Sequence, residues 1–507
     1  MKLIGKIHLA YILLASFHAN AQFYNLPGDY FFSILTEKRL ASPDSAIHTG
    51  LKPYVHFFSD KYVFVSDSHR VFKYIHDDPA IEEVFYKHLL RIEPPRENFK
   101  LRLDPLFNFE AGRDLAARTK KNLYTNTRGF IGSGNIGKKF YFETLFAENQ
   151  SVFPDYMGNY AAASAVIPGQ GRWKNFKHGG YDYAFASGFF SMQVFRNVNL
   201  QAGHGKQKIG HGYRSLLLSD NSFNYPYARI TQQWFKGRLQ YTNIYAALMN
   251  LVPASKIPTP NSERLFQKRP AAFQYLSINV SEQFNFGLFQ GVLWETGNYR
   301  NQSRITWQYV NPVIYSQLLT YGFNARQQIV AGGDVLCKLT SSFNIYGQVM
   351  LGSGWQDTIR DAGYQAGVKW FYPFGVKGLF LQAEYNNVSR NAYGNGGQLY
   401  NHYQQNLAYT PGNGREFTGI IDYRIKRFFC DIKYQYQATL PGKTEFAYLN
   451  ILNARAGYVV NPAYNLNISL GFTSRTQNFS NFKALNNETN YINLSLRTSI
   501  YNLYYDF

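Results

Sequence analysis

The sequence predicts an all-β fold: an antiparallel β-barrel that spans the outer membrane of a Gram-negative bacterium. Three observations favour this fold: apolar and polar residues alternate from about Leu106 onward, aromatic residues make up 18% of the chain, and the last segment ends on Phe507. Barrel strands face lipid on one side and a polar lumen on the other, with aromatic residues at both membrane interfaces. A secreted β-sandwich or propeller would share the alternation, but no repeat of fixed period supports a propeller.

The alternation is clearest in three segments, residues 276–281, 379–386 and 466–473. In the last of these, Leu466, Ile468, Leu470 and Phe472 alternate with polar residues. About 400 residues remain for the barrel, and at roughly 10 residues per strand plus loops they allow about 14 to 18 strands.

The last segment, residues 491–507, is expected to be the closing strand of the barrel. Its final apolar residues would share one strand face: Tyr501, Leu503, Tyr505 and Phe507. A terminal Phe resembles the signal that the barrel-insertion machinery recognises. The upstream apolar residues Ile492, Leu494 and Leu496 are out of phase with this face, so a bulge or a turn between two short strands is expected near residues 497–500.

The N-terminus indicates export. Lys2 and Lys6 precede an apolar run at residues 7–17, and Ala19-Asn20-Ala21 fits the small-x-small pattern before a cleavage site, so residues 1–21 read as a signal peptide. A transmembrane anchor is the alternative, but the run is short of the roughly 20 apolar residues that span a bilayer. Residues 22–105 should form a partly helical periplasmic or barrel-plugging segment, with helices at 29–40 and 78–90, and residues 106–507 the barrel.

The formal charge is +20, from 52 Lys and Arg against 32 Asp and Glu. In an exported protein, nucleic acid is not an expected partner. Phosphorylated lipid headgroups, including lipopolysaccharide, and acidic polysaccharides suit a positive field. The same charges could equally serve to solvate the loops and the lumen. Cys337 and Cys430 lie in phase with apolar neighbours, and we expect two free thiols rather than a disulfide.

Two glycine-rich segments mimic ligand-binding motifs. Residues 132–137 match G-x-G-x-x-G, but an aromatic strand-like segment follows where a dinucleotide site needs a helix, so we expect a hairpin. Residues 203–222 lack the ending of a phosphate loop and have no ligands at metal spacing, so no metal or other cofactor is expected. Residues 216–218, three leucines, break the alternation and predict a bulged or inward-folded segment. This segment reads either as an irregular hairpin loop or as a loop that contacts a ligand.

Residues 210–226 carry a resemblance. Together with short matches at 47–53, 104–107, 126–129, 148–150, 168–171, 311–312 and 384–386, they resemble the Wzi family of capsule-assembly outer-membrane proteins, in particular its branch with the gliding-motility protein RemB. Residues 407–412, Leu-Ala-Tyr-Thr-Pro-Gly, depart from the expected pattern. The resemblance implies 18 strands, a helical N-terminal segment near the periplasmic mouth, and a non-enzymatic role.

That role would be to bind, assemble or anchor surface polysaccharide, or to support gliding motility. Aromatic and hydrogen-bonding side chains hold sugars, and Arg suits acidic groups on them. The candidate ligand-binding residues are His204, His211, Tyr213, Arg214, Asp220, Asn221, Tyr225, Tyr227 and Arg229. Each could equally be an ordinary lumen or interface residue.

Three other functions compete with polysaccharide binding: a diffusion porin, an accessory subunit of an outer-membrane export or motility complex, and a barrel enzyme. An enzyme would need a nucleophile and a base in contact, and no spacing in the sequence places them so. We therefore predict no catalytic residues.

Overall fold

The computed structural model describes the following residues: 30, 34, 37–38, 47–55, 85–94, 98–117, 121–137, 139–253, 266–294, 307–323, 327–352, 361–394, 400–440, 445–498 and 502–507. The expected signal peptide, and most of the two expected helices at 29–40 and 78–90, lie outside them. Residues 30, 34, 37 and 38 are helical. No helix among the described residues is long and apolar enough to cross a membrane.

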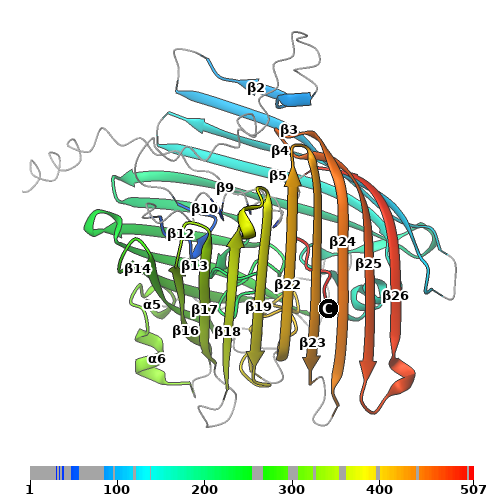
Figure 1. Ribbon diagram of the computed structural model, residues 1–507. Coiled ribbons are helices and arrows are strands. Elements are labelled where there is room, and N and C mark those ends of the chain that lie inside the picture. The colour runs from blue at the N-terminus through cyan, green and yellow to red at the C-terminus, as the bar shows by residue number, and fades with distance from the viewer. Residues whose placement is uncertain are drawn as a thin grey trace, which may run out of the picture.

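The strands close into one antiparallel barrel of 18 (Figure 1). In order around the wall they are β3 (Phe99–Asp114), β4 (Leu123–Ile136), β5 (Phe140–Val152), β9 (Gly180–Phe195), β10 (Val198–Gly205), β12 (Tyr225–Trp234), β13 (Leu239–Pro253), β14 (Phe266–Asn279), β15 (Phe284–Trp294), β16 (Gln327–Lys338), β17 (Phe343–Gly352), β18 (Ala362–Phe371), β19 (Leu379–Val388), β22 (Gly414–Ile425), β23 (Phe428–Thr439), β24 (Ala447–Asn461), β25 (Leu466–Phe479) and β26 (Asn487–Arg497). β26 pairs with β3 and closes the ring. The predicted fold class is confirmed.

The remaining elements are short. Two strands extend the wall at its edge: β2 (Leu90–Ile92) beside β3, and β8 (Lys174–Phe176) beside β9. Three two-stranded pairs join β1 (Leu51–Lys52) to β11 (Lys208–Ile209), β6 (Val166–Ile167) to β7 (Gly171–Arg172), and β20 (Asn401–His402) to β21 (Gln405–Asn406). The helices are α4 (Asp155–Ser164), α5 (Trp307–Val310) and α6 (Ser316–Tyr321).

The alternation of each strand places its side chains on the two faces of the wall. On β25, Ile468 and Leu470 are exposed, at 47% and 59%, whereas Ser469 between them is 2% exposed and points inward. Apolar side chains therefore cover the outside, where a bilayer would contact them, and polar side chains line the inside. Cys337 and Cys430 are free cysteines, as predicted.

The two ends of the barrel differ. Tight turns, such as residues 196–197 and 426–427, connect strands at one end, and long excursions, such as 153–179, 206–224 and 389–413, connect them at the other. In outer-membrane barrels the short turns are periplasmic and the long loops extracellular. The hairpin predicted at residues 132–137 joins β4 to β5 at the short-turn end, but residues 132–136 are the end of β4 and the turn begins at Gly137.

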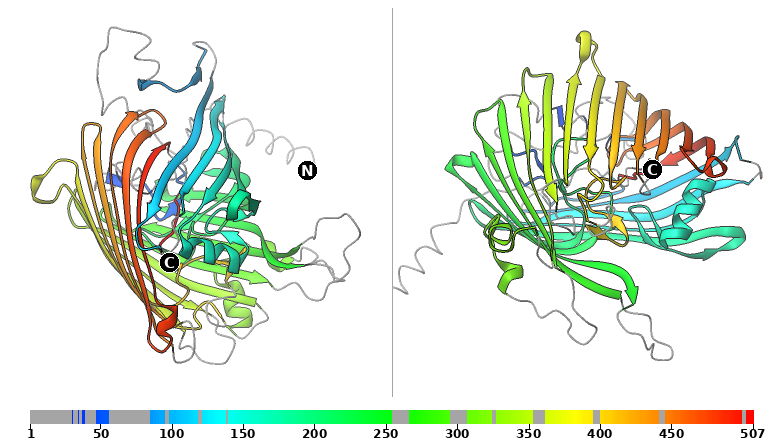
Figure 2. Two further views of the ribbon diagram at one scale, coloured as in Figure 1. Left: turned by 90° about the vertical axis from the view of Figure 1, so that its right-hand side faces the viewer. Right: turned by 90° about the horizontal axis from the view of Figure 1, so that it is seen from below.

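The predicted closing strand is corrected at its end. β26 ends at Arg497, where the interruption was expected, but residues 502–507 form no second strand. They lie inside the barrel, and the C-terminus falls within the ring of strands when the barrel is seen from below (Figure 2, right). The rings of Phe507 and Tyr160 of α4 approach to 4.3 Å between centroids. A buried ion pair, described below, holds Asp506 in the lumen instead of letting this segment continue along the wall.

Candidate functional site

The segment between β10 and β12, residues 206–224, folds into the lumen. Its β11 pairs with β1 of the N-terminal region, and Gly210 allows the sharp turn that follows, at a φ of +121°. Leu216, Leu217 and Leu218 are fully buried inside the barrel. The inward-folded segment predicted from this leucine run is confirmed, and it fills space that a wide channel would need.

A second inward segment, residues 389–413, supplies the apolar partner for the leucines. The hydroxyls of Tyr393 and Tyr400 donate to the main-chain oxygens of Leu216 and Leu217, at 2.8 and 2.9 Å. His402 joins this segment to the wall: its Nδ1 accepts from the amide of Met249 at 2.9 Å, and its Nε2 lies 3.0 Å from the Asn224 oxygen. Burial lowers the pKa of His402 to about 3, so the ring is neutral.

Arg214 ties the first segment to the wall and to the C-terminal tail. Its guanidinium donates to both carboxylate oxygens of Glu416 on β22, at 2.8–3.2 Å, and to Oδ1 of Asp506 at 3.1 Å. Lys433 of β23 donates to the other oxygen of Asp506 at 2.8 Å. Burial by itself would raise the pKa of Asp506, but the charges of Arg214 and Lys433 outweigh it and hold that pKa well below its usual range. Arg214, Glu416 and Asp506 are at most 1% exposed.

Glu384 of β19 receives the backbone of the same segment. Its two carboxylate oxygens accept the amides of Tyr213 and Arg214, at 2.7 and 3.0 Å. The Tyr213 hydroxyl donates to Asp506 at 2.5 Å. A single cluster of carboxylates and cations thus fixes the inward segment, the tail and the wall in one arrangement.

The predicted residues next to this cluster are also engaged by the protein itself. Asp220 accepts from Asn502 and Tyr504 of the tail, at 2.9 and 2.7 Å. Asn221 donates to the main-chain oxygen of Asn406 at 2.9 Å. These contacts anchor the tail and the second inward segment.

Tyr225, Tyr227 and Arg229 of β12 point into the lumen, and all three are buried. Arg229 donates to Gln207 at 2.8 Å and to the Pro53 oxygen at 3.1 Å, so it holds the N-terminal segment. Tyr227 accepts from Gln201 at 2.8 Å.

The two histidines do not lie together. His204 is in phase with the exposed Leu200 and Ala202 of β10, on the outer face near the long-loop end. His211 lies inside the barrel, with its Nε2 3.0 Å from Oδ2 of Asp334 on β16.

His211 and Asp334 form the kind of pair that an enzyme would need. The Thr49 hydroxyl is 3.5 Å from Nδ1 of His211, too long for a strong hydrogen bond. His211 and Asp334 are 5% and 1% exposed, so a substrate has no access to them. The arrangement is that of a buried structural pair. Within the described residues no group of three or more His, Cys, Asp or Glu side chains is placed to bind a metal.

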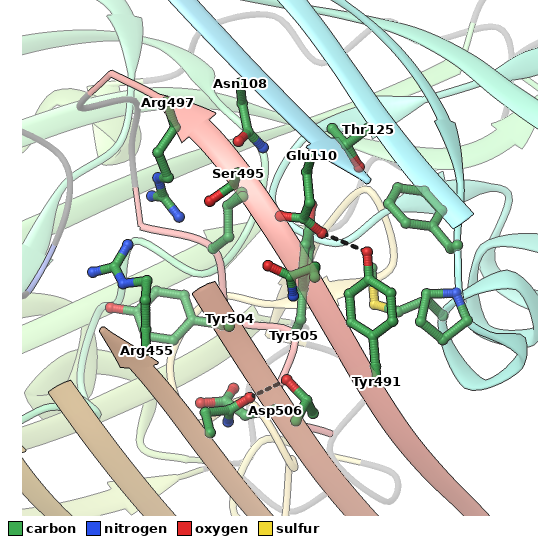
Figure 3. Close-up of a pocket in the computed structure, with 18 of the residues that line it drawn as sticks. Asn108, Glu110, Thr125, Arg455, Tyr491, Ser495, Arg497, Tyr504, Tyr505 and Asp506 are labelled. Atoms are coloured by element: carbon green, nitrogen blue, oxygen red, sulfur yellow. Dashed lines mark hydrogen bonds between the residues drawn. The ribbon is translucent and has the colours of Figure 1, made fainter. Parts of the chain in front are cut away.

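The open space lies beside the tail rather than at the predicted residues. A cavity of ≈ 260 Å³ separates the tail from the inner wall of β3–β5, β9 and β23–β26 (Figure 3). Tyrosines contribute from several directions: Tyr156, Tyr183, Tyr213, Tyr491, Tyr504 and Tyr505. Amides contribute as well: Asn108, Asn149, Asn453, Asn493 and Asn502. Of the nine predicted residues, Tyr213 alone is among those that line it.

The charged groups that line this cavity are three cations and three carboxylates: Lys433, Arg455, Arg497, Glu110, Asp431 and Asp506. Arg455 donates to Asp431 at 2.9 Å, and Lys433 donates to Asp506 at 2.8 Å. Glu110 accepts the Tyr491 hydroxyl at 2.8 Å (Figure 3). The cavity therefore offers hydrogen bonds and aromatic surface without a strong field of one sign. Such a lining suits an uncharged ligand rich in hydroxyl groups.

Sequence reasoning missed most of this lining because its residues come from eight strands, the connecting segments and the tail. Each residue is an ordinary inward-facing polar residue on its own strand. One signal was present: the apolar residues within 501–507 are out of phase with Ile492, Leu494 and Leu496, which indicates that the chain leaves the regular strand before its end.

No protein-family model matches this chain, and no curated protein matches it. Solved structures do resemble it in fold. Wzi of Escherichia coli, an outer membrane protein involved in group 1 capsule assembly and described as a carbohydrate-binding β-barrel, aligns over 80% of this chain and 85% of its own, with 13% identity and a TM-score of 0.47. OprD of Pseudomonas aeruginosa aligns over 78% and 94%, with 11% identity and a TM-score of 0.44. OccAB2 of Acinetobacter baumannii aligns over 79% and 97%, with 10% identity and a TM-score of 0.46. The chain is an outer-membrane type of β-barrel, and its place in the Wzi family or the RemB branch stays a prediction.

Proposed function

We propose that this protein is a non-enzymatic outer-membrane barrel that binds surface polysaccharide inside its lumen. The observation that carries the proposal is the cavity beside the tail, with its tyrosines, amides and mutually compensated charges. At ≈ 260 Å³ it is slightly smaller than the about 300–1,000 Å³ typical of small-molecule pockets, so it suits a short stretch or an end of a glycan. The resemblance of residues 210–226 to capsule-assembly proteins points in the same direction.

Open diffusion fits the lumen less well. Among the described residues, 206–224, 389–394, 400–413 and the tail all occupy the interior, and buried ion pairs hold the first segment and the tail there. A porin would keep a continuous aqueous path. The roles in gliding motility and in an export complex remain predictions from the resemblance, and no contact in the structure favours either.

A pocket-filling pair of variants tests the proposal. Asn493 and Leu494 are neighbours on β26, but Asn493 lines the cavity whereas Leu494 is 59% exposed on the outer face. Polysaccharide extracted from the native cell surface is titrated against the full-length protein in detergent, with uncharged oligosaccharides in parallel. The unaltered protein and the Leu494→Trp control should bind alike, and Asn493→Trp should not bind because the indole fills the cavity.

Two results would refute the proposal. One is the absence of binding by the unaltered protein, and the other is equal binding by both tryptophan variants. A planar-bilayer recording provides the comparison with a porin: the proposal requires the unaltered protein to lack the steady conductance of an open channel.

A further inference from the structure

Three amides lie on the outer face of the wall, where apolar residues are expected. Asn243, Gln274 and Gln290 are register partners on β13, β14 and β15 and so form one row across three strands. Their outward direction follows from their neighbours: Phe273 and Tyr275 point into the lumen, where they contact Tyr400 and Asp334.

This row lies within the apolar band rather than at its edge. Towards the short-turn end it is followed on the same face by Leu276 and Leu288, and towards the long-loop end by Ala272 and Val292. Amide groups at such a depth would be costly against hydrocarbon, because lipid offers them no hydrogen-bond partner. Yet all three are at most 5% exposed.

Residues 307–323, which contain α5 and α6, cover the row from outside. Gln274 donates to the main-chain oxygen of Asn311 at 3.3 Å, and the Tyr245 hydroxyl donates to that of Val310 at 3.0 Å. The Tyr315 hydroxyl donates to the Gly332 oxygen on β16 at 3.1 Å. Figure 1 draws α5 and α6 beside these strands, away from the lumen. The outer-wall cover, residues 307–323, thus turns polar groups towards the wall.

The far side of the outer-wall cover is apolar. Trp307, Val313 and Leu319 are 73%, 58% and 84% exposed, although the covered wall beneath them is buried. The 17 residues from Trp307 to Phe323 include no Asp, Glu, Lys, Arg or His, in a chain whose formal charge is +20. A water-exposed loop of this length would normally carry charges, whereas a lipid-exposed one would not.

We infer that the outer-wall cover lies within the hydrocarbon of the membrane, with its apolar side against lipid acyl chains and its polar side on the amide row. The row and the cover then form one unit: Gln274 and the hydroxyls of Tyr245 and Tyr315 fix the cover to the wall, and the cover shields the amides from lipid. The partner of this surface is the lipid itself. The surface is separate from the cavity in the lumen and does not depend on the proposed ligand.

Spin labels at three leucines test this placement. In the full-length chain with Cys337→Ser and Cys430→Ser, single cysteines are introduced by Leu319→Cys on the cover, Leu470→Cys on the bare lipid-facing wall, and Leu485→Cys in the loop after β25. The native side chains at these sites are 84%, 59% and 58% exposed, so the three labels differ mainly in their surroundings. Each variant, in phospholipid vesicles, is first shown to be folded by its heat-dependent migration on a denaturing gel.

Collision of each label with oxygen, which concentrates in hydrocarbon, is compared with collision with a water-soluble nickel chelate. The ratio of oxygen collision to nickel collision should be the same for Leu319→Cys and Leu470→Cys. It should exceed the ratio for Leu485→Cys about tenfold, because apolar oxygen enters the hydrocarbon whereas the polar chelate stays in water. A ratio like that of Leu485→Cys would place the cover in water and overturn the inference. Low collision with both probes would mean that a protein, such as a second copy, covers it, and would overturn the inference equally.

Discussion

The ion pairs of Arg214 make the strongest prediction. Arg214→Met keeps the unbranched apolar part of the side chain but removes the guanidinium, which leaves Glu416 buried without its ion-pair partner and Asp506 paired with Lys433 alone. Removing one partner of a buried ion pair typically costs about 3–5 kcal/mol, because the other charge stays desolvated. At about 1.4 kcal/mol per tenfold change, residues 206–224 should leave the lumen at least about a hundred times more often.

Tryptic cleavage after Lys206 and Lys208 measures this release, because both lysines lie on the inward segment and are protected while it is folded in. When opening is fast compared with cleavage, the cleavage rate follows the open population. The rate should rise about a hundredfold or more in Arg214→Met, and adding Glu416→Gln should restore part of the protection by removing one uncompensated carboxylate.

The matched control is Lys121→Met. Lys121 and Asp155 form an ion pair at 3.0 Å, but both are more than half exposed, and such a pair contributes at most about 1 kcal/mol. Lys121→Met should therefore leave the cleavage rate of residues 206–224 unchanged. An increase of less than about fivefold in Arg214→Met, equivalent to about 1 kcal/mol, would refute the claim that this cluster anchors the segment.

Three further predictions concern neighbouring features. The pKa of His402 is about 3 in the folded protein and 6.5 when exposed, so the released state binds more protons between these two pH values. Residues 389–413 should therefore loosen as the pH falls through that window. A spin label introduced by Gln404→Cys should gain mobility from pH 7 to pH 4, and it should gain less when His402→Gln is also present. A Cβ at Gly210, where φ is +121°, would lie 2.0 Å from Nε2 of Gln348. Gly210→Ala should therefore destabilise the folded-in position of residues 206–224 by at least about 1–3 kcal/mol and speed their tryptic cleavage. Gly137→Ala, which has open space around it, should not change that cleavage. The unfolded chain should take up two maleimide groups without reductant, because Cys337 and Cys430 are free; no uptake before reduction would contradict this.

The fold could be predicted because the alternation of apolar and polar residues that marks a barrel strand is visible within the sequence of that strand alone. From Leu466 to Phe472, apolar and polar residues alternate along the sequence, and their side chains alternate between the outer and inner faces of β25. A register shift of one residue would turn all the apolar side chains to the inner face. The inward fold of residues 206–224 was also visible, since three adjacent leucines cannot all face lipid from one strand. The prediction for the end of the chain is wrong for a related reason: Leu503, Tyr505 and Phe507 alternate like a strand. In the lumen, however, Leu503 packs against the inner wall, and Tyr505 and Phe507 pack against the α4 region.

The ligand-binding hypothesis fared differently from the fold. Arg214, Asp220 and Arg229 are residue types that can bind sugars, but each already has a partner within the protein. Arg214 binds Glu416, Asp220 binds the tail, and Arg229 binds the N-terminal segment. Residue type reveals what a side chain can bind, and only its neighbours decide whether it is free to do so.

By itself, the sequence determined the class of fold and the faces of its strands, because those follow from an alternation that is local to each strand. Only the tertiary structure decided which buried charges pair, that the tail returns into the lumen, where the cavity lies, and that residues 307–323 cover an amide row on the outer wall. These features join residues as distant along the chain as Arg214 and Asp506, or Gln274 and Asn311. Such contacts depend on the closed ring that brings the segments together, and no local pattern records them.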